Sequence, residues 1–352
     1  MKKRIFQFGP KLDQKGGIVT VIDSIMKLNF PDEFSIENIG TTNANNKVYE
    51  FLKSISYTLK KLINKEIDIA HIHVASNGSF YRKSIIALIC KFFKVPVIIH
   101  IHGGYFKEFY KSMNKTTKKY FFYVLKKIDN VIVLTESWKE FFSQFLDEKK
   151  IYVVSNFTFV PKVKNSQLSN KKEKIEILFL GKLGKVKGTY DLIDAAEILK
   201  NRDLKFKIIL AGDGEIEKCK DKIKQKGLSE CVNVIGWINK EQKEKYLKNS
   251  DILVLPSYFE SFGLSLIEAM SYKIPVIASW GGEMSEVVRD GIDGMLITPG
   301  NVEELADKIE ILIKDDDIRK KYSENGYIRV VENFSAEIAT EKLKKIYFEL
   351  LG

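Results

Sequence analysis

Short apolar runs alternate with longer amphipathic segments along the whole chain, and this alternation limits the fold more than any other feature. An apolar run such as Asp251-Ile-Leu-Val-Leu-Pro256 predicts a strand buried on both faces. Chains that alternate such strands with helices form parallel α/β sheets. The alternation stops in a polar segment and begins again at Ile175, so we predict two sheets in tandem.

The break divides the chain into two predicted domains. We expect a Rossmann-like, doubly wound amino-terminal domain over residues 1–163 and a second one over residues 175–332. Residues 164–174 are polar, lack periodicity and are predicted to be the linker. The last helix, residues 333–352, is expected to pack back on the first domain. A length of 352 residues suits two domains better than one.

Cysteine usage and the amino-terminal sequence indicate in which cellular compartment the protein is expected. The three cysteines, Cys90, Cys219 and Cys231, are widely spaced and odd in number, which argues against a disulfide framework and favours a reducing environment. The sequence opens on a strand-like segment and shows no signal peptide and no long apolar run. We therefore expect a cytoplasmic protein, with any contact to the inner face of the cytoplasmic membrane being peripheral.

Positive charge is concentrated in the first half of the chain. Residues 1–170 contain 27 Lys and Arg against 14 Asp and Glu, whereas the remainder contains 30 against 32. Such an excess indicates an anionic partner on that side. The stretch from Tyr105 to Lys127 mixes aromatics with lysines, which suits docking on an anionic membrane surface; alternatively, the aromatics fill the core beneath solvated lysines. No nucleic-acid motif accompanies them, so no nucleic-acid partner is expected.

One stretch, Ser257 to Met270, combines a strand end, a tight loop and a helix start. Gly263 lets the backbone approach a ligand closely, and the first N–H groups of the helix point outward unpaired, a geometry that binds phosphate. Glu260 and Glu268 bracket this site and are placed to accept hydrogen bonds from sugar hydroxyls. The alternative is that these glutamates are solvated acids favoured by the helix dipole.

Glycine-rich turns follow other predicted strands as well. In chain order they are Gly16-Gly17, Gly181-Lys182, Lys187-Gly188, Gly212-Asp-Gly214 and Gly236-Trp237. Ligands of open parallel sheets bind beyond the carboxyl ends of the strands, where all of these turns fall. Two such edges facing each other would form a cleft between the domains.

Taken together, these motifs resemble the retaining glycosyltransferases of family 4, which have the GT-B architecture of two Rossmann-like domains facing across a cleft. The resemblance covers the whole chain and is strongest from Ile177 to Pro299. Within the family, the chain resembles bacterial enzymes of surface polysaccharide synthesis, such as those for capsule and O-antigen.

The resemblance implies roles for individual residues. Lys182 and Lys187 would neutralise a donor diphosphate, although the family often has arginine at the first position. The implied catalytic residues are His102, Glu260 and Lys187. The implied donor-binding residues are Gly16, Gly17, Lys182, Lys187, Gly214, Gly236, Trp237, Ile238, Glu260, Ser261, Phe262, Gly263, Leu264 and Glu268. On the acceptor side, a loop and helix start offer Ser76, Asn77, Ser79, Arg82 and Lys83.

The reaction implied is transfer of a hexosyl or N-acetylhexosaminyl group from a nucleoside-diphosphate sugar, UDP being favoured, to a saccharide or polyprenyl-diphosphate-linked acceptor. The anomeric configuration would be retained, with attack on the same face as departure of the diphosphate. The sugar nucleotide is a co-substrate, and neither a cofactor nor a metal is expected. Backbone N–H groups and lysines would stabilise the leaving phosphate instead.

Two other functions remain open from the sequence. A UDP-sugar 2-epimerase on the same architecture would convert its sugar nucleotide without an acceptor. A non-catalytic protein that binds sugar nucleotides or polysaccharide would tolerate the loss of Glu260. The presence of Lys182, Lys187, Glu260 and Glu268 argues against the second of these.

Two further patterns resemble metal sites. His71 and His73 alternate on one predicted strand and His100 and His102 on another, which allows a zinc site. We prefer a hydrogen-bonding function, with His71 and His100 packed between sheet and helix and His102 beside the sugar. The run from Asp315 to Asp317 matches a metal-binding Asp-x-Asp motif, but its place between two predicted helices favours a helix cap.

Overall fold

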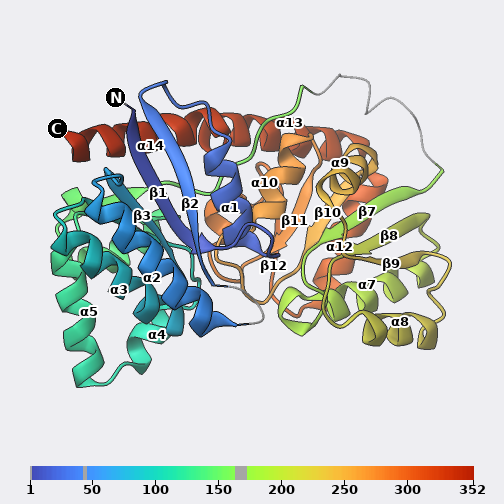
Figure 1. Cartoon of the computed structure of the whole chain (residues 1–352). Coiled ribbons are helices and arrows are strands. Elements are labelled where there is room, and N and C mark those ends of the chain that lie inside the picture. The colour runs from blue at the N-terminus through green and yellow to red at the C-terminus, as the bar shows by residue number, and fades with distance from the viewer. Residues whose placement is uncertain (1, 43–45, 163–172) are drawn as a thin grey trace. The chain divides into compact units, whose positions relative to one another are not determined.

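The computed structural model describes residues 2–42, 46–162 and 173–352 (Figure 1). The chain forms two compact units. Unit 1 comprises Met1–Phe157 together with Ala336–Gly352, and unit 2 comprises Thr158–Ser335. These divisions lie a few residues from the predicted limits at 163 and 332. Residues 164–172 of the predicted linker lie outside the described residues.

Unit 1 contains a six-stranded parallel sheet with the strand order β2-β1-β3-β4-β5-β6, which confirms the predicted α/β class. Its strands are β1 (Lys3–Pro10), β2 (Phe34–Thr42), β3 (Ile69–Val74), β4 (Val97–Ile101), β5 (Asn130–Val133) and β6 (Ile151–Val153). Its helices are α1 (Gly17–Met26), α2 (Lys47–Ile63), α3 (Gly78–Phe92), α4 (Phe106–Ser112), α5 (Lys115–Lys127), α6 (Glu136–Ser143) and α14 (Ala336–Leu351).

Strand alternation divides the interior of unit 1 into two cores. Phe6 and Phe8 of β1 point to one face, which helices α2 to α6 cover. Ile5 of the same strand points to the other face, which α1 and α14 cover. Because successive side chains of a strand point to opposite faces, each strand contributes to both cores.

The last helix of the chain belongs to the core of the first unit. Leu343 and Tyr347 of α14 are fully buried against Ile5, Ile69 and other residues of the sheet. In Figure 1 this helix is the dark red one that ends at the C-terminus. The sheet face that α14 covers is therefore completed by the final residues of the sequence.

Truncation of Leu343 is expected to destabilise unit 1. Leu343→Ala removes a side chain that is 0% exposed, so we expect a loss of about 2–5 kcal/mol in the free energy of unfolding. Lys342→Ala, at the exposed neighbouring position, is the control and should change stability by less than about 0.5 kcal/mol. Urea titration followed through Trp138, which is buried in unit 1, measures both. Equal stability of the two variants would contradict the placement of α14.

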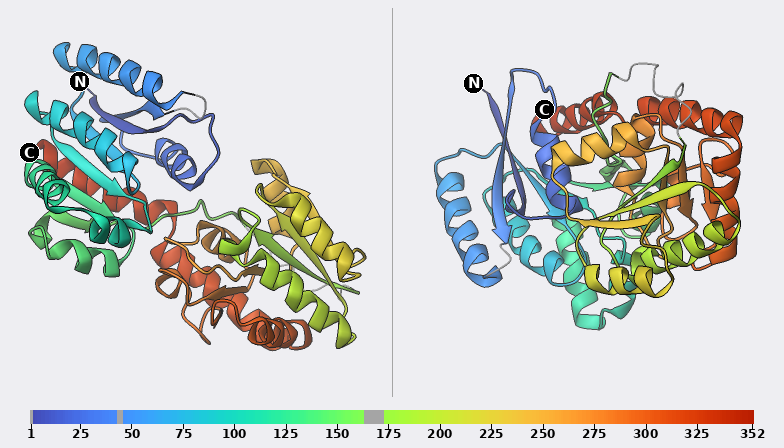
Figure 2. Two further views of the ribbon diagram at one scale, coloured as in Figure 1. Left: turned by 90° about the horizontal axis from the view of Figure 1, so that it is seen from below. Right: turned by 90° about the vertical axis from the view of Figure 1, so that its right-hand side faces the viewer.

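Unit 2 contains a second six-stranded parallel sheet, with the order β12-β11-β10-β7-β8-β9. Its strands are β7 (Ile175–Leu180), β8 (Phe206–Ala211), β9 (Val232–Gly236), β10 (Ile252–Leu255), β11 (Val276–Ser279) and β12 (Met295–Ile297). Its helices are α7 (Thr189–Asn201), α8 (Ile216–Gln225), α9 (Lys240–Asn249), α10 (Leu264–Ser271), α11 (Met284–Val287), α12 (Val302–Lys314) and α13 (Asp316–Asn333). Figure 2 shows the units from two further directions.

Asp315, the first residue of the Asp-x-Asp match, lies immediately before α13. The Asp315 side chain accepts a hydrogen bond from the backbone N–H of Ile318 and caps α13, which confirms the capping interpretation of the Asp-x-Asp match. Within the described part of the chain, none of the helices combines the length and the apolar character needed to cross a bilayer.

The aromatic residues between Tyr105 and Lys127 mainly build the core. Phe106, Phe109 and Phe121 are buried in the cluster beneath α4 and α5, and neighbouring aromatics pack against it. Only Tyr105 and Tyr123 of the described aromatics in this stretch are exposed. The structure therefore favours the core interpretation over a membrane-docking one for this segment.

Candidate active site

The carboxyl edge of the unit 2 sheet carries the predicted phosphate-binding turn. Strand β10 ends at Leu255, and the chain then passes through a loop to α10. Gly263 adopts a left-handed conformation (φ 78°) and caps α10 without any side-chain hydrogen bond. Among the described residues, the backbone N–H groups of Phe262, Gly263 and Leu264 have no acceptor. These donors make the start of α10 suitable for an anion.

A lysine–glutamate pair lies beside this turn. Lys187 Nζ is 2.5 Å from Glu260 Oε1, and the two side chains are only 24% and 16% exposed. Lys187 also donates to the Phe259 carbonyl at 3.4 Å. An ammonium has three N–H donors, so one remains for a further acceptor. The pair brings together two predicted site residues that lie 73 positions apart in the chain.

Glycines allow the loops of this pair to pack closely. A Cβ atom at Gly188, whose φ is +66°, would lie 2.1 Å from the Pro256 carbonyl oxygen. A Cβ atom at Gly282, whose φ is +75°, would lie 2.0 Å from the Glu260 carbonyl oxygen. Any larger residue would therefore push Lys187 or Glu260 out of place.

Lys182 follows β7 on the same edge of the sheet. Its side chain is exposed and forms no salt bridge with a described residue. Its stem packs over Gly214, where an added Cβ would lie 3.1 Å from Lys182 Cγ and 2.3 Å from the Leu183 carbonyl oxygen. The backbone N–H of Leu183 donates to the Asp213 carbonyl at 2.6 Å and joins the two turns. Lys182 is therefore an exposed cation at the sheet edge that makes no salt bridge with a described residue, although its charge adds to the effects of Lys218 and Tyr190 that lower the pKa of Glu215.

Glu268 lies on α10, one turn after the helix start. Its Oε1 accepts from Lys243 Nζ at 2.5 Å, and the glutamate side chain is 15% exposed. Its second carboxylate oxygen has no partner among the described residues. That oxygen is available to a hydroxyl donor. Lys243 lies on α9 and was not predicted as a site residue.

The remaining predicted donor residues also lie on loops of this edge. Gly236 ends β9 with φ +72°, and its carbonyl accepts from the Gly212 N–H at 2.8 Å. Trp237 follows with its ring 49% exposed, and Ile238 is half-buried. Ser261 is half-buried in the loop before α10.

The predicted glycine turn of unit 1 opens α1. Gly16 has φ 139° and caps the helix, and Gly17 is its first residue. The cap has no side-chain hydrogen bond, and the first turn contains no acidic residue. An added Cβ at either glycine would meet no atom within 4 Å.

The predicted acceptor residues cluster at the start of α3. Asn77 is exposed with φ 56° and is the capping residue of α3. The Ser79 hydroxyl accepts from the Ala75 N–H at 3.2 Å. Ser76 and Arg82 are half-buried in the same region. The loop is held against the end of β4, because a Cβ atom at Gly103 would lie 2.8 Å from the Ser76 nitrogen.

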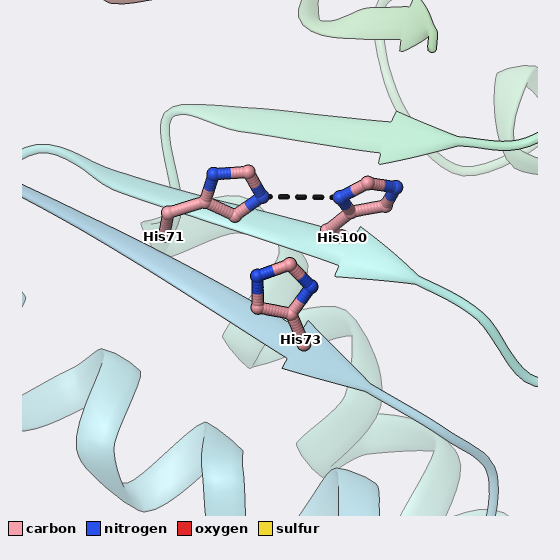
Figure 3. Close-up of side chains that lie close together, drawn as sticks. All are labelled: His71, His73 and His100. Atoms are coloured by element: carbon pink, nitrogen blue, oxygen red, sulfur yellow. Dashed lines mark hydrogen bonds between the residues drawn. The ribbon is translucent and has the colours of Figure 1, made fainter. Parts of the chain in front are cut away.

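All four histidines of the chain form one buried cluster on the α14 face of the unit 1 sheet. His71 Nδ1 lies 2.8 Å from the Tyr347 hydroxyl, and His71 Nε2 lies 3.1 Å from His100 Nδ1. Figure 3 shows that hydrogen bond and the neighbouring His73. His73 and His100 are directly opposite each other in the β3–β4 ladder.

A second chain of hydrogen bonds determines where the proton of His102 lies. The Gln7 amide donates to the Ile22 carbonyl at 3.4 Å, so its oxygen accepts from His73 Nε2 at 2.8 Å. Because His73 is neutral and Nε2 carries its proton, His73 Nδ1 has to accept. His102 Nε2 therefore donates to His73 Nδ1 at 2.8 Å, so the proton of His102 lies on Nε2. His102 Nδ1 is then an acceptor nitrogen to which no described residue donates.

Burial keeps the cluster neutral. It lowers the pKa of His71 to about 3 and the pKa of His102 to about 3. Burial, followed by the neighbouring histidines, also holds the pKa values of His73 and His100 well below the usual range. Lys83 of α3 is 4% exposed, and burial lowers its pKa to about 7.

The geometry favours hydrogen bonding over metal binding in this cluster. One ligand atom each of His71, His73 and His100 falls within 4.8 Å of the others, so the three could surround an ion. However, the ring nitrogens already bond to one another, to Tyr347 and to Gln7. No carboxylate or thiolate among the described residues joins them to compensate the charge of a buried dication.

Comparison with known proteins establishes the family. The family model described as Glycosyltransferase Family 4 matches residues 3–158, and the model described as Glycosyl transferases group 1 matches residues 161–329. An uncharacterized glycosyltransferase of Methanocaldococcus jannaschii, MJ1069, is 32% identical over 278 residues, covering 74% of this chain and 70% of the relative. The chain is a family 4 glycosyltransferase.

Other similar proteins connect this glycosyltransferase with surface polysaccharides and with the GT-B fold. The capsular polysaccharide biosynthesis glycosyltransferase CapM of Staphylococcus aureus is 29% identical over 248 residues, 65% of each chain. The solved structure of Anabaena Alr3699/HepE in complex with UDP and glucose matches 99% of this chain and 100% of its own, with a TM-score of 0.76 and 18% identity. The predicted GT-B architecture of two Rossmann-like sheets is thereby confirmed.

The structure adds residues that our sequence analysis of this glycosyltransferase missed. They are Lys243, which contacts Glu268, and Gln7 and Tyr347, which contact the histidine cluster. Gln7 could have been noticed in the sequence, because it is a polar residue between Phe6 and Phe8 on a strand predicted to be buried. Tyr347 had none, because it lies 276 positions from His71.

Proposed function

We propose that this glycosyltransferase transfers a hexose or N-acetylhexosamine from a UDP-sugar to a hydroxyl of a lipid-linked saccharide. The observation that carries the proposal is the Lys187–Glu260 pair beside the unpaired N–H groups at the start of α10. The complex of Alr3699/HepE with UDP and glucose, a protein of the same fold, supports UDP as the nucleotide. The relationship to CapM supports an acceptor in surface polysaccharide synthesis.

In this proposal the diphosphate binds at the start of α10. Backbone N–H groups of Phe262, Gly263 and Leu264 donate to phosphate oxygens, and Lys182 and Lys187 supply positive charge. Cleavage of the donor builds negative charge on the β-phosphate, which these preorganised groups stabilise without rearranging. In metal-dependent transferases a divalent cation stabilises this charge. Because the proposed site uses N–H groups and lysines instead, transfer is expected to persist in EDTA.

Glutamates are proposed to hold the two sugars of the donor. The free carboxylate oxygen of Glu268 accepts from the ribose hydroxyls, while Lys243 fixes the other oxygen. Glu260 accepts from hydroxyls of the transferred sugar, and its negative charge favours the positive charge that develops on the ring. We propose retention of configuration, with the leaving phosphate taking the acceptor proton. In unit 1, His102, to whose Nδ1 no described residue donates, is the proposed sugar-facing residue.

Donor binding tests the site directly. Calorimetry of the full chain with UDP, GDP and ADP in EDTA should show selective binding of UDP. Glu268→Ala is expected to weaken it about tenfold to a hundredfold, because a hydrogen bond to a charged group is lost. Glu217→Ala, which removes an exposed glutamate of α8, is the matched control and should bind like the wild type. Absence of nucleotide binding by the folded protein would reject the site.

The reaction itself needs a second readout. With UDP-sugar and membrane lipid extract, the product and its anomeric configuration can be read by mass spectrometry and NMR. Release of UDP only in the presence of acceptor supports transfer. Conversion of the sugar to an epimer without acceptor would instead favour the 2-epimerase.

A further inference from the structure

Helices α2 and α3 present a continuous apolar surface to solvent. On α2, an apolar side chain recurs every three or four residues along one face, as Val48, Leu52, Ile55, Leu59 and Ile63. On α3 the corresponding residues are Ile85, Leu88, Ile89 and Phe92. The two rows meet in a groove lined by Leu59, Ile85, Leu88, Ile89, Phe92 and Phe93. We call these rows and their groove the α2–α3 face; both helices lie side by side in Figures 1 and 2.

Part of this face packs on the core, through the partly buried Ile55, Leu88, Ile89 and Phe93. The core side of α2 also includes the buried Phe51 and Leu62. By contrast, Leu52 is 60% exposed, Ile63 67% and Phe92 84%. Contiguous exposed apolar residues of this kind mark a binding surface, whereas single ones do not.

The charges around the face identify the chemistry of its partner. On α3, which has no acidic residue, Lys83 is buried and Lys91 pairs with Asp129 at 2.8 Å, so neither adds free charge to the face. Helix α2 contains four lysines and a single acid, Glu50, which Lys11 neutralises at 2.8 Å. Lys53 and Lys60 have no salt bridge with any described residue and flank the apolar row. The face is therefore apolar, with two lysines of α2 along it that pair with no described residue.

We propose that the α2–α3 face docks the chain on an anionic lipid bilayer. Leu52, Ile63 and Phe92 would enter the boundary between headgroups and acyl chains, while Lys53 and Lys60 contact lipid phosphates. An amphipathic helix with apolar and basic faces binds lipid surfaces in this way. A second copy of this chain fits less well, because two cationic faces would meet. This docking is independent of the donor site, and it replaces the 105–127 segment as the membrane-binding surface.

The test is flotation of the full chain with vesicles, in the absence of donor and acceptor. The anionic vesicles contain phosphatidylcholine with roughly 30% phosphatidylglycerol, a charge density to which basic protein surfaces respond. We expect the chain to bind these vesicles and to bind little to vesicles of phosphatidylcholine alone. Combined Leu52→Ser, Ile63→Ser and Phe92→Ser should reduce binding at least about tenfold. Lys53→Gln with Lys60→Gln should reduce it about 25-fold at low salt, and high salt should reproduce that loss.

Matched controls come from unit 2. Ile311→Ser with Ile328→Ser removes apolar residues that are 37% and 51% exposed, and Lys224→Gln with Lys245→Gln removes exposed lysines. Both controls should bind vesicles like the wild type, and all variants should bind UDP unchanged, which shows that they are folded. The proposal would be overturned if the chain bound neutral and anionic vesicles equally or bound neither of them. It would also be overturned if the triple variant kept the vesicle binding of the wild type. A dimer that the triple variant abolishes, without vesicle binding, would assign the face to a second copy.

Discussion

Sugar transfer is expected to fall by at least about 100-fold in Lys187→Met and in Glu260→Gln. Each substitution removes one member of a 2.5 Å ion pair whose side chains are mostly buried. In Lys187→Met, the charge that would stabilise the departing β-phosphate is lost, and Glu260 is left without its counterion. In Glu260→Gln, the negative charge near the reacting sugar is lost, and Lys187 is free to bind the phosphate too tightly or out of position.

Two comparisons separate this function from a structural one. Lys185→Met and Glu217→Gln change exposed residues of unit 2 and should transfer sugar at the wild-type rate. The double variant of Lys187 and Glu260 should be no slower than the slower single variant, because the two residues act as a unit. Rates are measured as UDP released together with glycosylated product. Wild-type rates in both single variants, with circular dichroism unchanged, would exclude the pair from catalysis.

Mild acid is expected to destabilise unit 1 by about 5.5 kcal/mol between pH 7.5 and 5.5. Burial lowers the pKa of His71 and His102 to about 3, and the pKa values of His73 and His100 also lie well below the usual value near 6.5. In this pH range the unfolded chain therefore takes up protons that the folded chain does not. Stability is fully present above about pH 6.5 and is lost as pH falls toward the folded pKa.

Each histidine contributes about 1.4 kcal/mol over these two pH units, which is a large part of the 5–15 kcal/mol typical of a domain. Lys83, the nearby buried lysine, has a pKa of about 7 in the folded protein, so above pH 7 the folded chain releases a proton that the unfolded chain keeps, and stability rises with pH there. Below about pH 6.5 Lys83 is mostly protonated in both states, so the pH dependence of stability in that range comes from the histidines.

Urea titrations at the two pH values measure this effect. His100→Leu is the informative variant, because His100 Nε2 has no partner among the described residues and its replacement leaves the Gln7–His73–His102 chain in place. The variant should lose about one quarter of the pH dependence, in keeping with one proton fewer. Equal stability of unit 1 at pH 7.5 and pH 5.5 would show that the histidines are not buried as neutral groups.

Much of the donor site could be predicted because its signals are local. The strand, glycine and helix start around Gly263 lie within one stretch of sequence, and helix-capping geometry follows from neighbouring residues. The same is true of Asp315, whose capping bond spans three residues. The direct Lys187–Glu260 bond was beyond the sequence, since it depends on the side-by-side position of β7 and β10.

The aromatic residues between Tyr105 and Lys127 illustrate the opposite case. Their mixture with lysines suits either a lipid surface or a core, and the spacing does not separate the two. Packing decided it, because α4, α5 and α6 meet over the sheet and bury Phe106, Phe109 and Phe121. The exposed apolar residues lie instead on α2 and α3. In the sequence, their spacing of three or four positions is the same as that of an amphipathic helix that faces the core.

By itself, the sequence determined the strand–helix alternation, the parallel class of both sheets and the turns at their carboxyl edges. These depend on periodicity, backbone freedom of glycine and capping, which act over a few residues. Only the tertiary structure decided which side chains of α14 enter the core of unit 1, that Tyr347 and Gln7 join the four histidines, and that Lys243 holds Glu268. Such contacts join residues far apart in the chain, and only close packing of the whole unit selects them.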